Sequence, residues 1–249
     1  MPVAELPVLQ APFAWHGDHV VAELPGGARA LFTSRHGGVS SGPFASLNLG
    51  RLTDDDGANV DENRRRVAEW TGCARERFLY GRQIHGAVVR RAAEPPGPAR
   101  PAAEEDGQAT ALRGAPALVF VADCLPVVLA ADGAVAAVHG GWRGIADGVL
   151  EEGLRALRDV GGTGPVTTLI GPGARGCCYE VGEEVHERFA AYDARRGERN
   201  LDLATVVRAR LDADVHDTGL CTMCRPDLFF SHRRSGGVTG RHAGVVWRP

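Results

Sequence analysis

The fold of this chain is set by the stretch VFVADCLPVVLAADGAVAAVHGGWRG, residues 119–144. Two apolar runs in it are joined by Asp132-Gly133, a strong signal for a two-residue β-hairpin turn. Folding the chain at that turn pairs Pro126 with His139 and places Cys124 diagonally next to His139 on the same face. A register slipped by one residue would put the last two directly opposite each other. In either register, one end of the hairpin carries a thiol and an imidazole.

A third side chain of the same chemistry is His85, in the segment RQIHGAVV. Together with Cys124 and His139 it makes a His/Cys/His set. Three protein ligands with one open position are typical of a catalytic zinc site. Without a metal, the same residues could act as a cysteine nucleophile with a histidine base. Taken singly, each of them also suits an ordinary buried side chain, so the residues alone leave these interpretations open.

The composition excludes several classes of protein. All 28 basic residues are arginine, so enzymes that need a Schiff-base, pyridoxal phosphate or Walker A lysine are excluded. Arginine is then the only fixed cation that can hold a phosphate. The net charge of −3 argues against a nucleic-acid surface, and 44% hydrophobic residues in 249 suffice for a large core. The chain has no long apolar run and no basic leader, so we expect a cytoplasmic protein without a membrane span or signal peptide.

Two further motifs have weaker interpretations. Cys221 and Cys224 form a lone CxxC, and the nearest partners for a structural zinc are the adjacent Cys177 and Cys178. Because adjacent cysteines are poor ligands for one metal ion, we interpret these thiols as incidental. The run GPGARG at 171–176 matches GxGxxG, but no second strand ending in an acid follows, so we expect no dinucleotide site.

Strands and helices alternate along the chain. Strands are predicted at Leu31–Ser34, within Phe78–Arg91, and at Ala117–Val121, Pro126–Ala131, Ala134–Val138, Val166–Ile170, Phe229–His232 and Ala243–Trp247. Helices are predicted at Asp61–Trp70, Ile145–Arg158, Glu183–Tyr192 and Leu203–Leu211. The proline-rich run Ala92–Ala103 is predicted to be an exposed loop. Mixed strands with interleaved helices predict an α+β fold with a mixed sheet in a single domain, residues 1–249.

The order of motifs over about residues 30–247 resembles one known family. The motifs are TSRHGGVSSGPFASLNLG, ENRRRV, QIHG, EEDGQAT, VADCLPVVLAADGAVAAVHGGWRG, IGPGARGCCYEVG, LDL, CT and FFSHRRSGGVTGR. They resemble the family first labelled polyphenol oxidase or laccase-domain proteins and now regarded as purine nucleoside phosphorylases. Some of its members are named peptidoglycan editing factors. The resemblance implies a four-layer α/β/β/α sandwich, related to a bacterial toxin deamidase with a Cys-His site.

The resemblance also implies roles for individual residues. His85, Cys124 and His139 match the family's zinc-binding, catalytic positions. Asn48 of SLNLG and Arg64 of ENRRRV match polar residues that line the same pocket in relatives. Arg143 follows His139 by four residues, so it is the second candidate, after Arg64, for holding phosphate.

The implied activity is phosphorolysis of adenosine, inosine and methylthioadenosine at a zinc ion, with adenosine deamination as a second activity. The alternatives are a metal-independent Cys-His hydrolase that edits peptidoglycan precursors and a non-catalytic binding protein in cell-wall or division control. Multicopper oxidation is rejected as the native role because it needs about ten histidines, many in HxH pairs. The chain has nine histidines and no HxH. Copper is expected only as an adventitious substitute for zinc.

Overall fold

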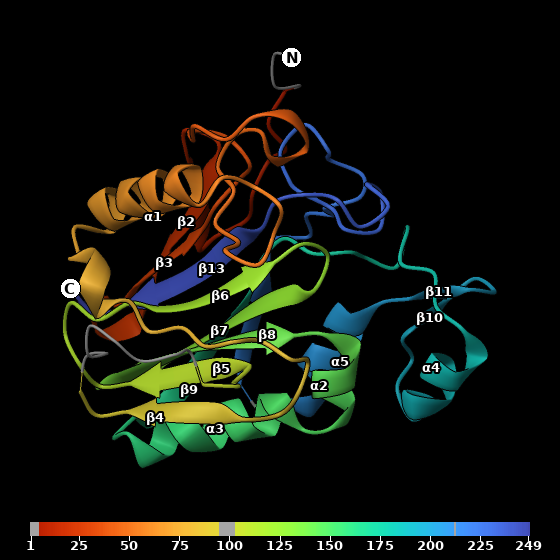
Figure 1. The fold of residues 1–249 in the computed structure, drawn as a ribbon. Helices are drawn as coiled ribbons and strands as arrows, with labels where there is room; N and C mark the ends of the chain where they lie inside the picture. The colour runs from red at the N-terminus through yellow and green to blue at the C-terminus, as the bar shows by residue number, and fades with distance from the viewer. Residues whose placement is uncertain (1–4, 95–102, 212) are drawn as a thin grey trace.

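The architecture is built on two sheets that stack face to face (Figure 1). It is a computed structural model that describes residues 5–94, 103–211 and 213–249. The antiparallel sheet contains, in order, β1 (Phe13–His16), β2 (His19–Glu23), β3 (Arg29–Phe32), β13 (His242–Trp247) and β6 (Ala117–Val121). The mixed sheet contains, in order, β12 (Asp214–Asp217), β9 (Thr163–Ile170), β7 (Leu125–Asp132), β8 (Ala134–Gly140), β5 (Gly107–Thr110) and β4 (Val89–Ala92).

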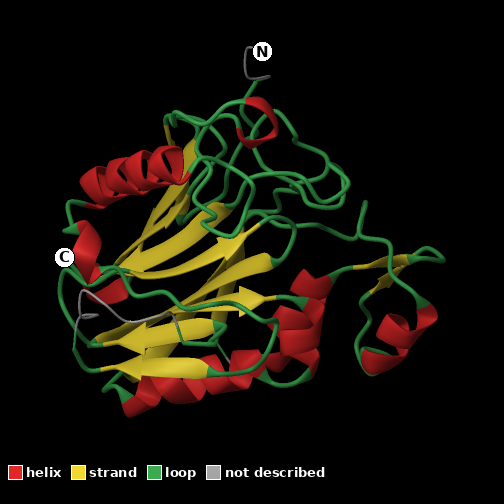
Figure 2. Ribbon diagram, in the orientation of Figure 1, coloured by secondary structure: helices red, strands yellow, loops and turns green. Residues whose placement is uncertain are grey.

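Helices cover the outer faces of both sheets, which makes four layers (Figure 2). One outer layer is α1 (Gly57–Thr71), which packs Val67 and Ala68 on the antiparallel sheet. The other outer layer, on the mixed sheet, consists of α2 (Trp142–Ala146), α3 (Val149–Asp159) and α5 (Leu203–Arg210). The small elements are α4 (Glu183–Arg188), the pair β10 (Arg195–Arg196) and β11 (Asn200–Leu201), and the 3-10 turns η1 (Pro25–Gly27), η2 (Gly42–Phe44) and η3 (Arg75–Arg77). The α/β/β/α sandwich is therefore confirmed.

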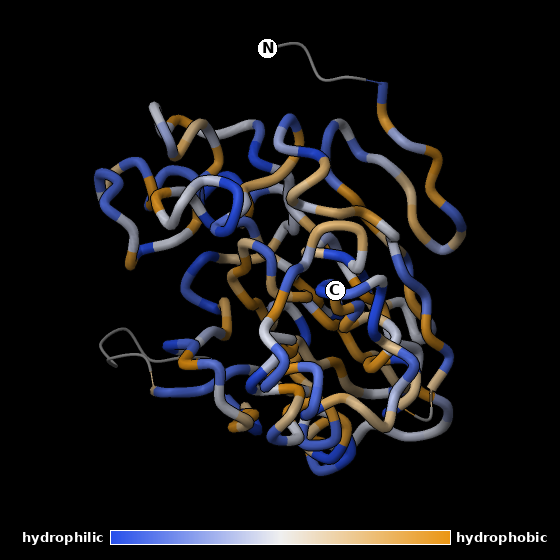
Figure 3. The backbone as a smooth tube through the Cα atoms, turned by 90° about the vertical axis from the view of Figure 1, so that its right-hand side faces the viewer, coloured by the Kyte–Doolittle hydropathy of each residue, from blue (hydrophilic) through white to orange (hydrophobic). Residues whose placement is uncertain are grey.

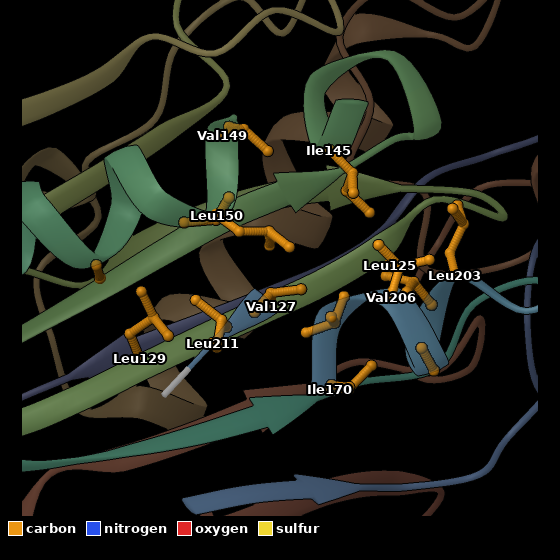
Figure 4. Packing of buried hydrophobic residues seen from close by; sticks show 14 of the residues in the cluster. Leu125, Val127, Leu129, Ile145, Val149, Leu150, Ile170, Leu203, Val206 and Leu211 are labelled. Atoms are coloured by element: carbon orange, nitrogen blue, oxygen red, sulfur yellow. The ribbon is translucent and has the colours of Figure 1, made fainter. Parts of the chain in front are cut away.

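The long apolar runs of the sequence are strands that are buried on both faces. In β7, Val127 and Leu129 pack under the helices, whereas Val128 and Ala130 face the antiparallel sheet. Figure 4 shows the helix side of this packing, where Val149 and Leu150 of α3 lie over the strand. Hydrophobic segments run through the middle of the molecule and many outer loops are hydrophilic (Figure 3). Because neither face of the strand meets water, the usual alternation of polar and apolar residues disappears.

The central hairpin has the predicted register. Ala131 pairs with Ala134 and Pro126 pairs with His139, with the turn at Asp132-Gly133. Gly133 has a φ of 88°, a left-handed conformation that glycine adopts without steric cost. The pairing is thus determined locally by turn chemistry.

Two sequence predictions need correction, and several short strands were missed. The helix predicted at Ile145–Arg158 is two helices, because Gly148 has a φ of 97° and breaks it between α2 and α3. The strand predicted at Phe229–His232 is wrong: it is a turn-rich segment whose phenylalanines fill the core. Apolar runs this short do not distinguish a strand from a buried loop. The short strands β1, β2, β5, β10, β11 and β12 were not predicted.

Two loops complete the comparison with the sequence. The run GPGARG follows β9 as an irregular loop, and no helix begins within it. Gly171 lies so close to Phe32 that a Cβ atom there would be 2.2 Å from its ring, so this glycine serves packing. The loop predicted at Ala92–Ala103 lies mostly outside the described residues.

Candidate metal centre

The open end of the β7–β8 hairpin brings together the three predicted side chains. Cys124 immediately precedes β7, His139 lies near the end of β8, and His85 comes from the loop before β4. One ligand atom from each lies within 4.8 Å of the others. The Cys124 Sγ is 3.8 Å from the His85 Nε2, and the two imidazole ring centroids are 4.8 Å apart. We call these three residues the trio.

Asp106, which precedes β5, holds the trio in place. Its carboxylate accepts three consecutive backbone N–H groups, those of Ile84, His85 and Gly86, at 2.7 to 3.1 Å. It also accepts the Nδ1 of His139 at 2.7 Å. Successive N–H groups converge on one anion when neighbouring residues alternate in handedness. This explains why His85, a non-glycine residue, has a φ of 62°.

Asp106 also determines which imidazole atom of His139 can bind a ligand. Because its Nδ1 is engaged by the carboxylate, the Nε2 is the atom left for a metal. Carboxylates behind metal-binding histidines orient the ring in this way and raise its basicity. Sequence analysis did not single out Asp106. The only feature of the sequence that could have pointed to Asp106 is its place in the acidic run EEDGQAT. In the structure this carboxylate is fully buried.

Space beside the trio depends on Gly141. A Cβ atom at this position would lie 2.8 Å from the His85 Cδ2, 3.4 Å from the Cys124 Sγ and 3.7 Å from the His139 Cε1. Tetrahedral zinc with bonds of about 2.0–2.3 Å separates its ligand atoms by about 3.5 Å. The two nitrogen donors and one sulfur donor of the trio lie within 4.8 Å of one another, and the Cys124–His85 pair is 3.8 Å apart, so the trio offers three ligands to one metal ion.

The charges of the trio are coupled. Burial alone would raise the pKa of the Cys124 thiol, but His139 and His85 outweigh it and lower this pKa to about 6. Burial alone would lower the pKa of His139, but the Cys124 thiolate and Asp106 raise it to about 9. Without metal, the thiolate and the imidazolium therefore stabilise each other between these two values. The thiolate is lost as pH falls through about 6, and the imidazolium is lost as pH rises through about 9.

A pH titration of the metal-free protein tests this coupling. After chelation of metal, alkylation of Cys124 by iodoacetamide should have its midpoint near pH 6 instead of near 9, the ordinary value of the thiol pKa. Mass spectrometry of the peptide that contains Cys124 gives the rate at each pH. Cys73 is the internal control, because burial raises the pKa of its thiol and it should react only in more alkaline solution. A Cys124 midpoint near 9 would contradict the coupling.

Further polar residues surround the trio. Asp123, directly before Cys124, has a φ of 90° and accepts bonds from the Thr222 hydroxyl and the Arg233 backbone N–H, both at 2.7 Å. Non-glycine residues in this conformation are strained and cluster at functional sites. Tyr179 is buried, and burial together with the Cys124 charge raises the pKa of its phenol. These residues are far apart in sequence, and nothing in the sequence pattern joins them.

Two arginines of interest lie on this side of the molecule. Arg143 is exposed on α2, with its guanidinium carbon 4.5 Å from the Trp142 ring centroid. Its charge opposes the rise in the pKa of Tyr179. Burial lowers the pKa of Arg241, and the Cys124 and Asp123 charges oppose this. Arg241 was not predicted, and it adds a cation near the trio.

Asn48 lies in the loop between η2 and α1, and Arg64 lies in α1, the helix that covers the antiparallel sheet. Asn48 is fully buried and donates to Thr53 and Asp55, while its oxygen accepts the backbone N–H groups of Gly50 and Arg241. Its amide is thus used within the protein, and a contact with substrate stays a prediction.

Arg64 donates twice to the Leu49 carbonyl, and its guanidinium carbon lies 4.9 Å and 4.6 Å from the ring centroids of Tyr80 and Phe120. The Gln83 amide bonds the backbone of Phe120 at 2.8 Å, which ties this layer to the loop of His85. The structure therefore places Arg64 beside that loop. Its part in phosphate binding stays a prediction.

No helix among the described residues is both long and apolar enough to cross a bilayer.

Comparison with curated proteins finds relatives along nearly the whole chain. A purine nucleoside phosphorylase of Pseudomonas aeruginosa is 38% identical over 239 residues, covering 90% of this chain and 94% of the relative. One of Streptomyces coelicolor is 37% identical over 233 residues, covering 89% and 96%.

Solved structures agree with the fold. YlmD from Geobacillus stearothermophilus has a TM-score of 0.85 at 32% identity, covering 95% of this chain and 98% of YlmD. The Bacillus licheniformis protein YfiH has a TM-score of 0.86 at 25% identity, covering 96% and 100%. Residues 29–249 match the family described as multi-copper polyphenol oxidoreductase laccase. Together with the relatives' similarity over nine-tenths of the chain, this match shows that the chain belongs to that family.

Proposed function

We propose that this protein is a zinc-dependent purine nucleoside phosphorylase acting on adenosine, inosine and methylthioadenosine, with adenosine deamination as a second activity. The observation that carries the proposal is the trio, which the missing side chain of Gly141 leaves uncrowded and which Asp106 supports. Relatives that share about 37% of its residues are named purine nucleoside phosphorylases. The copper in the family description has weaker support, because nine histidines without an HxH pair cannot build a multicopper cluster.

Zinc bound by His85, Cys124 and His139 would supply a Lewis acid with one open position. The residues of the chain provide its setting. Asp106 fixes the loop of His85 and the ring of His139, so the donor atoms are positioned before substrate binds. Tyr179, with its pKa raised, stays protonated at neutral pH and keeps a hydroxyl proton at this side of the trio.

In phosphorolysis, a phosphate oxygen bonds to C1′ of the ribose while the bond from C1′ to the purine nitrogen breaks. The bonding pair leaves with the base, which takes up a proton, and the sugar product is ribose 1-phosphate. Phosphate must therefore be held beside the ribose, and arginine side chains are the fixed cations available. Arg64 is the first candidate and Arg143 the second.

The surroundings of Arg64 suit an anion. Burial lowers its pKa to about 10, so it remains a cation at neutral pH. Its hydrogen bonds are to the neutral Leu49 carbonyl, and no carboxylate of the described residues forms an ion pair with it. A half-buried guanidinium without a paired carboxylate is a suitable receptor for phosphate.

The test of the proposal is the dependence of base release on phosphate. Release of hypoxanthine from inosine should rise with phosphate and saturate, and the sugar product should carry phosphate. Chromatography of products with and without phosphate measures this. Equal base release in phosphate-free buffer, with free ribose as product, would show a hydrolase instead.

Arg64→Ala should weaken the dependence on phosphate more than the affinity for nucleoside. One lost charge-assisted bond is worth roughly 1.5–3 kcal/mol, about a 10- to 150-fold rise in the phosphate KM. Arg65→Ala is the matched control. Arg65 is next in the same helix but pairs with Glu62 and Glu69 at the surface, so its loss should leave the phosphate KM unchanged. Equal effects of both changes would remove Arg64 from the phosphate site.

One observation favours a second candidate function. The lowered pKa of Cys124 next to two histidines also suits a metal-independent cysteine nucleophile that cleaves peptidoglycan precursors. The two functions differ in their need for metal. Cleavage of a cell-wall precursor peptide by chelated protein, with no base released from nucleosides, would favour the hydrolase.

A further inference from the structure

A second cluster of soft ligands lies away from the trio. The sulfur atoms of Cys177, Cys178, Cys221 and Cys224 all lie within 4.8 Å of one another. The Cys224 Sγ is 3.1 Å from that of Cys178 and 3.6 Å from that of Cys177. All four are free thiols, so no disulfide explains their proximity. We propose that these four cysteines, the tetrathiolate cluster, bind a second metal ion, zinc, in a closed structural site.

On sequence alone, the adjacent Cys177 and Cys178 are poor ligands for one metal ion, but the local backbone geometry allows both to bind it. Adjacent cysteines in a strand point to opposite faces. Cys177 and Cys178, however, lie in a single helical turn, in which the N–H groups of Cys178 and Tyr179 both bond the Arg175 carbonyl. Successive side chains of such a turn differ by about 100° around its axis, so both can reach one point. The interpretation of these thiols as incidental missed this turn.

The CxxC segment has the surroundings of a metal-bound thiolate. Cys221 is buried, which alone would raise the pKa of its thiol. The surrounding backbone of Cys224 and Arg175, the Cys177 side chain and the backbone of Met223 lower the pKa instead. Polar groups that favour the charged form of a buried thiol suit a thiolate ligand.

The thiols of Cys177 and Cys224 favour the neutral form in the absence of a cation. Burial and neighbouring thiols raise the pKa of Cys177 to about 11, and neighbouring thiols together with burial raise that of Cys224. Zinc bonds to thiolate sulfur at about 2.3 Å, so four sulfurs around one ion are about 3.8 Å apart. The two sulfur–sulfur separations of 3.6 and 3.1 Å are near this value, and a divalent cation would offset the repulsion between the thiolates.

The position of the tetrathiolate cluster suits a structural role. It joins the loop after β9 to the loop after β12, which are also linked by the backbone bridge between Gly173 and Cys221 and by the ion pair of Arg175 with Asp217. Next to these cysteines, Thr222 bonds Asp123, the neighbour of Cys124, and the Cys124 charge raises the pKa of Tyr179. Four protein ligands leave no position for substrate, so the second ion would fasten these loops and take no part in the reaction. The inference does not depend on the proposed function.

Metal analysis tests the inference. Protein purified under reducing conditions without chelator should carry one zinc more per chain than Cys224→Ser, whatever the trio holds. With both sites filled, the wild type has two ions and Cys224→Ser has one. Cys73→Ser is the matched control, because Cys73 lies outside both clusters, and it should keep the wild-type count. Equal zinc in the wild type and Cys224→Ser would overturn the inference.

A second measurement covers the case in which Cys224→Ser fails to fold. In Cys124→Ala the trio loses its sulfur, so any cobalt(II) bound with thiolate ligands must occupy the tetrathiolate cluster. We expect intense sulfur-to-cobalt absorption and the visible bands of tetrahedral cobalt. The absence of both, or a disulfide between Cys178 and Cys224 in the reduced preparation, would contradict the proposed site.

Discussion

Replacing Cys124 by alanine is expected to remove the metal ion from the trio and to abolish nucleoside turnover. The change deletes the only sulfur donor and leaves two imidazoles, which are too few ligands for a stable zinc site. A bound Lewis acid contributes several kcal/mol to transition-state stabilisation, so the rate should fall by about 10³-fold or more. Zinc analysis should show one ion fewer per chain than in the wild type.

The fold should survive this change, because Cys124 is small, half-buried and at the end of a strand. Circular dichroism of the variant and of Cys73→Ser as control checks this point. A Cys124→Ala protein that keeps all of its zinc would refute the assignment of this residue as a ligand. A variant that loses zinc but keeps turnover would instead separate the metal from the reaction.

Replacing Asp106 by alanine should have the second largest effect. The change leaves three backbone N–H groups and the Nδ1 of His139 without their common acceptor. Removing one partner of a buried charged pair costs about 3–5 kcal/mol. Loss of the carboxylate behind a metal-binding histidine typically weakens metal affinity by about 10–100-fold. We therefore expect a lower free energy of unfolding together with weaker zinc binding.

The variant Asp106→Asn separates the effect of Asp106 on zinc binding from its effect on the free energy of unfolding. The asparagine keeps the size of the side chain but points an NH₂ group at one pair of the donors, so zinc binding should still weaken while more stability is retained. Glu105→Gln is the matched control, because Glu105 is also buried but bonds none of the three ligands in the described structure. Competition with a chromogenic chelator gives the zinc affinity, and urea titration gives the free energy of unfolding. Unchanged zinc affinity in both Asp106 variants would show that this carboxylate serves folding alone.

The central hairpin and the proximity of Cys124 and His139 could be predicted from the sequence because short-range rules decide them. The turn at Asp132-Gly133 determines the pairing of β7 with β8, and the two-residue period of a strand then puts Cys124 and His139 on one face. His85 was added through the motif QIHG and the family resemblance, not through any pairing rule. The boundaries of helices were harder to predict from the sequence, because Gly148 ends one helix within a continuous apolar pattern.

Other features depended on loops that meet only after the two sheets have packed. His85 and Asp106 are 21 residues apart, and Cys177 and Cys224 are 47 apart. Both contacts join irregular segments, whose course follows no period in the sequence.

The sequence by itself thus determined the central hairpin and the thiol and imidazole at its end, because these follow from one turn and a period of two, and the structure selected the first of the two registers. The tertiary structure alone decided that Asp106 supports the trio, that Arg64 lies on two aromatic rings, and that four cysteines converge. The physical reason is that loop positions depend on the packing of layers distant in the chain, and the free energy of that packing comes from the buried core as a whole.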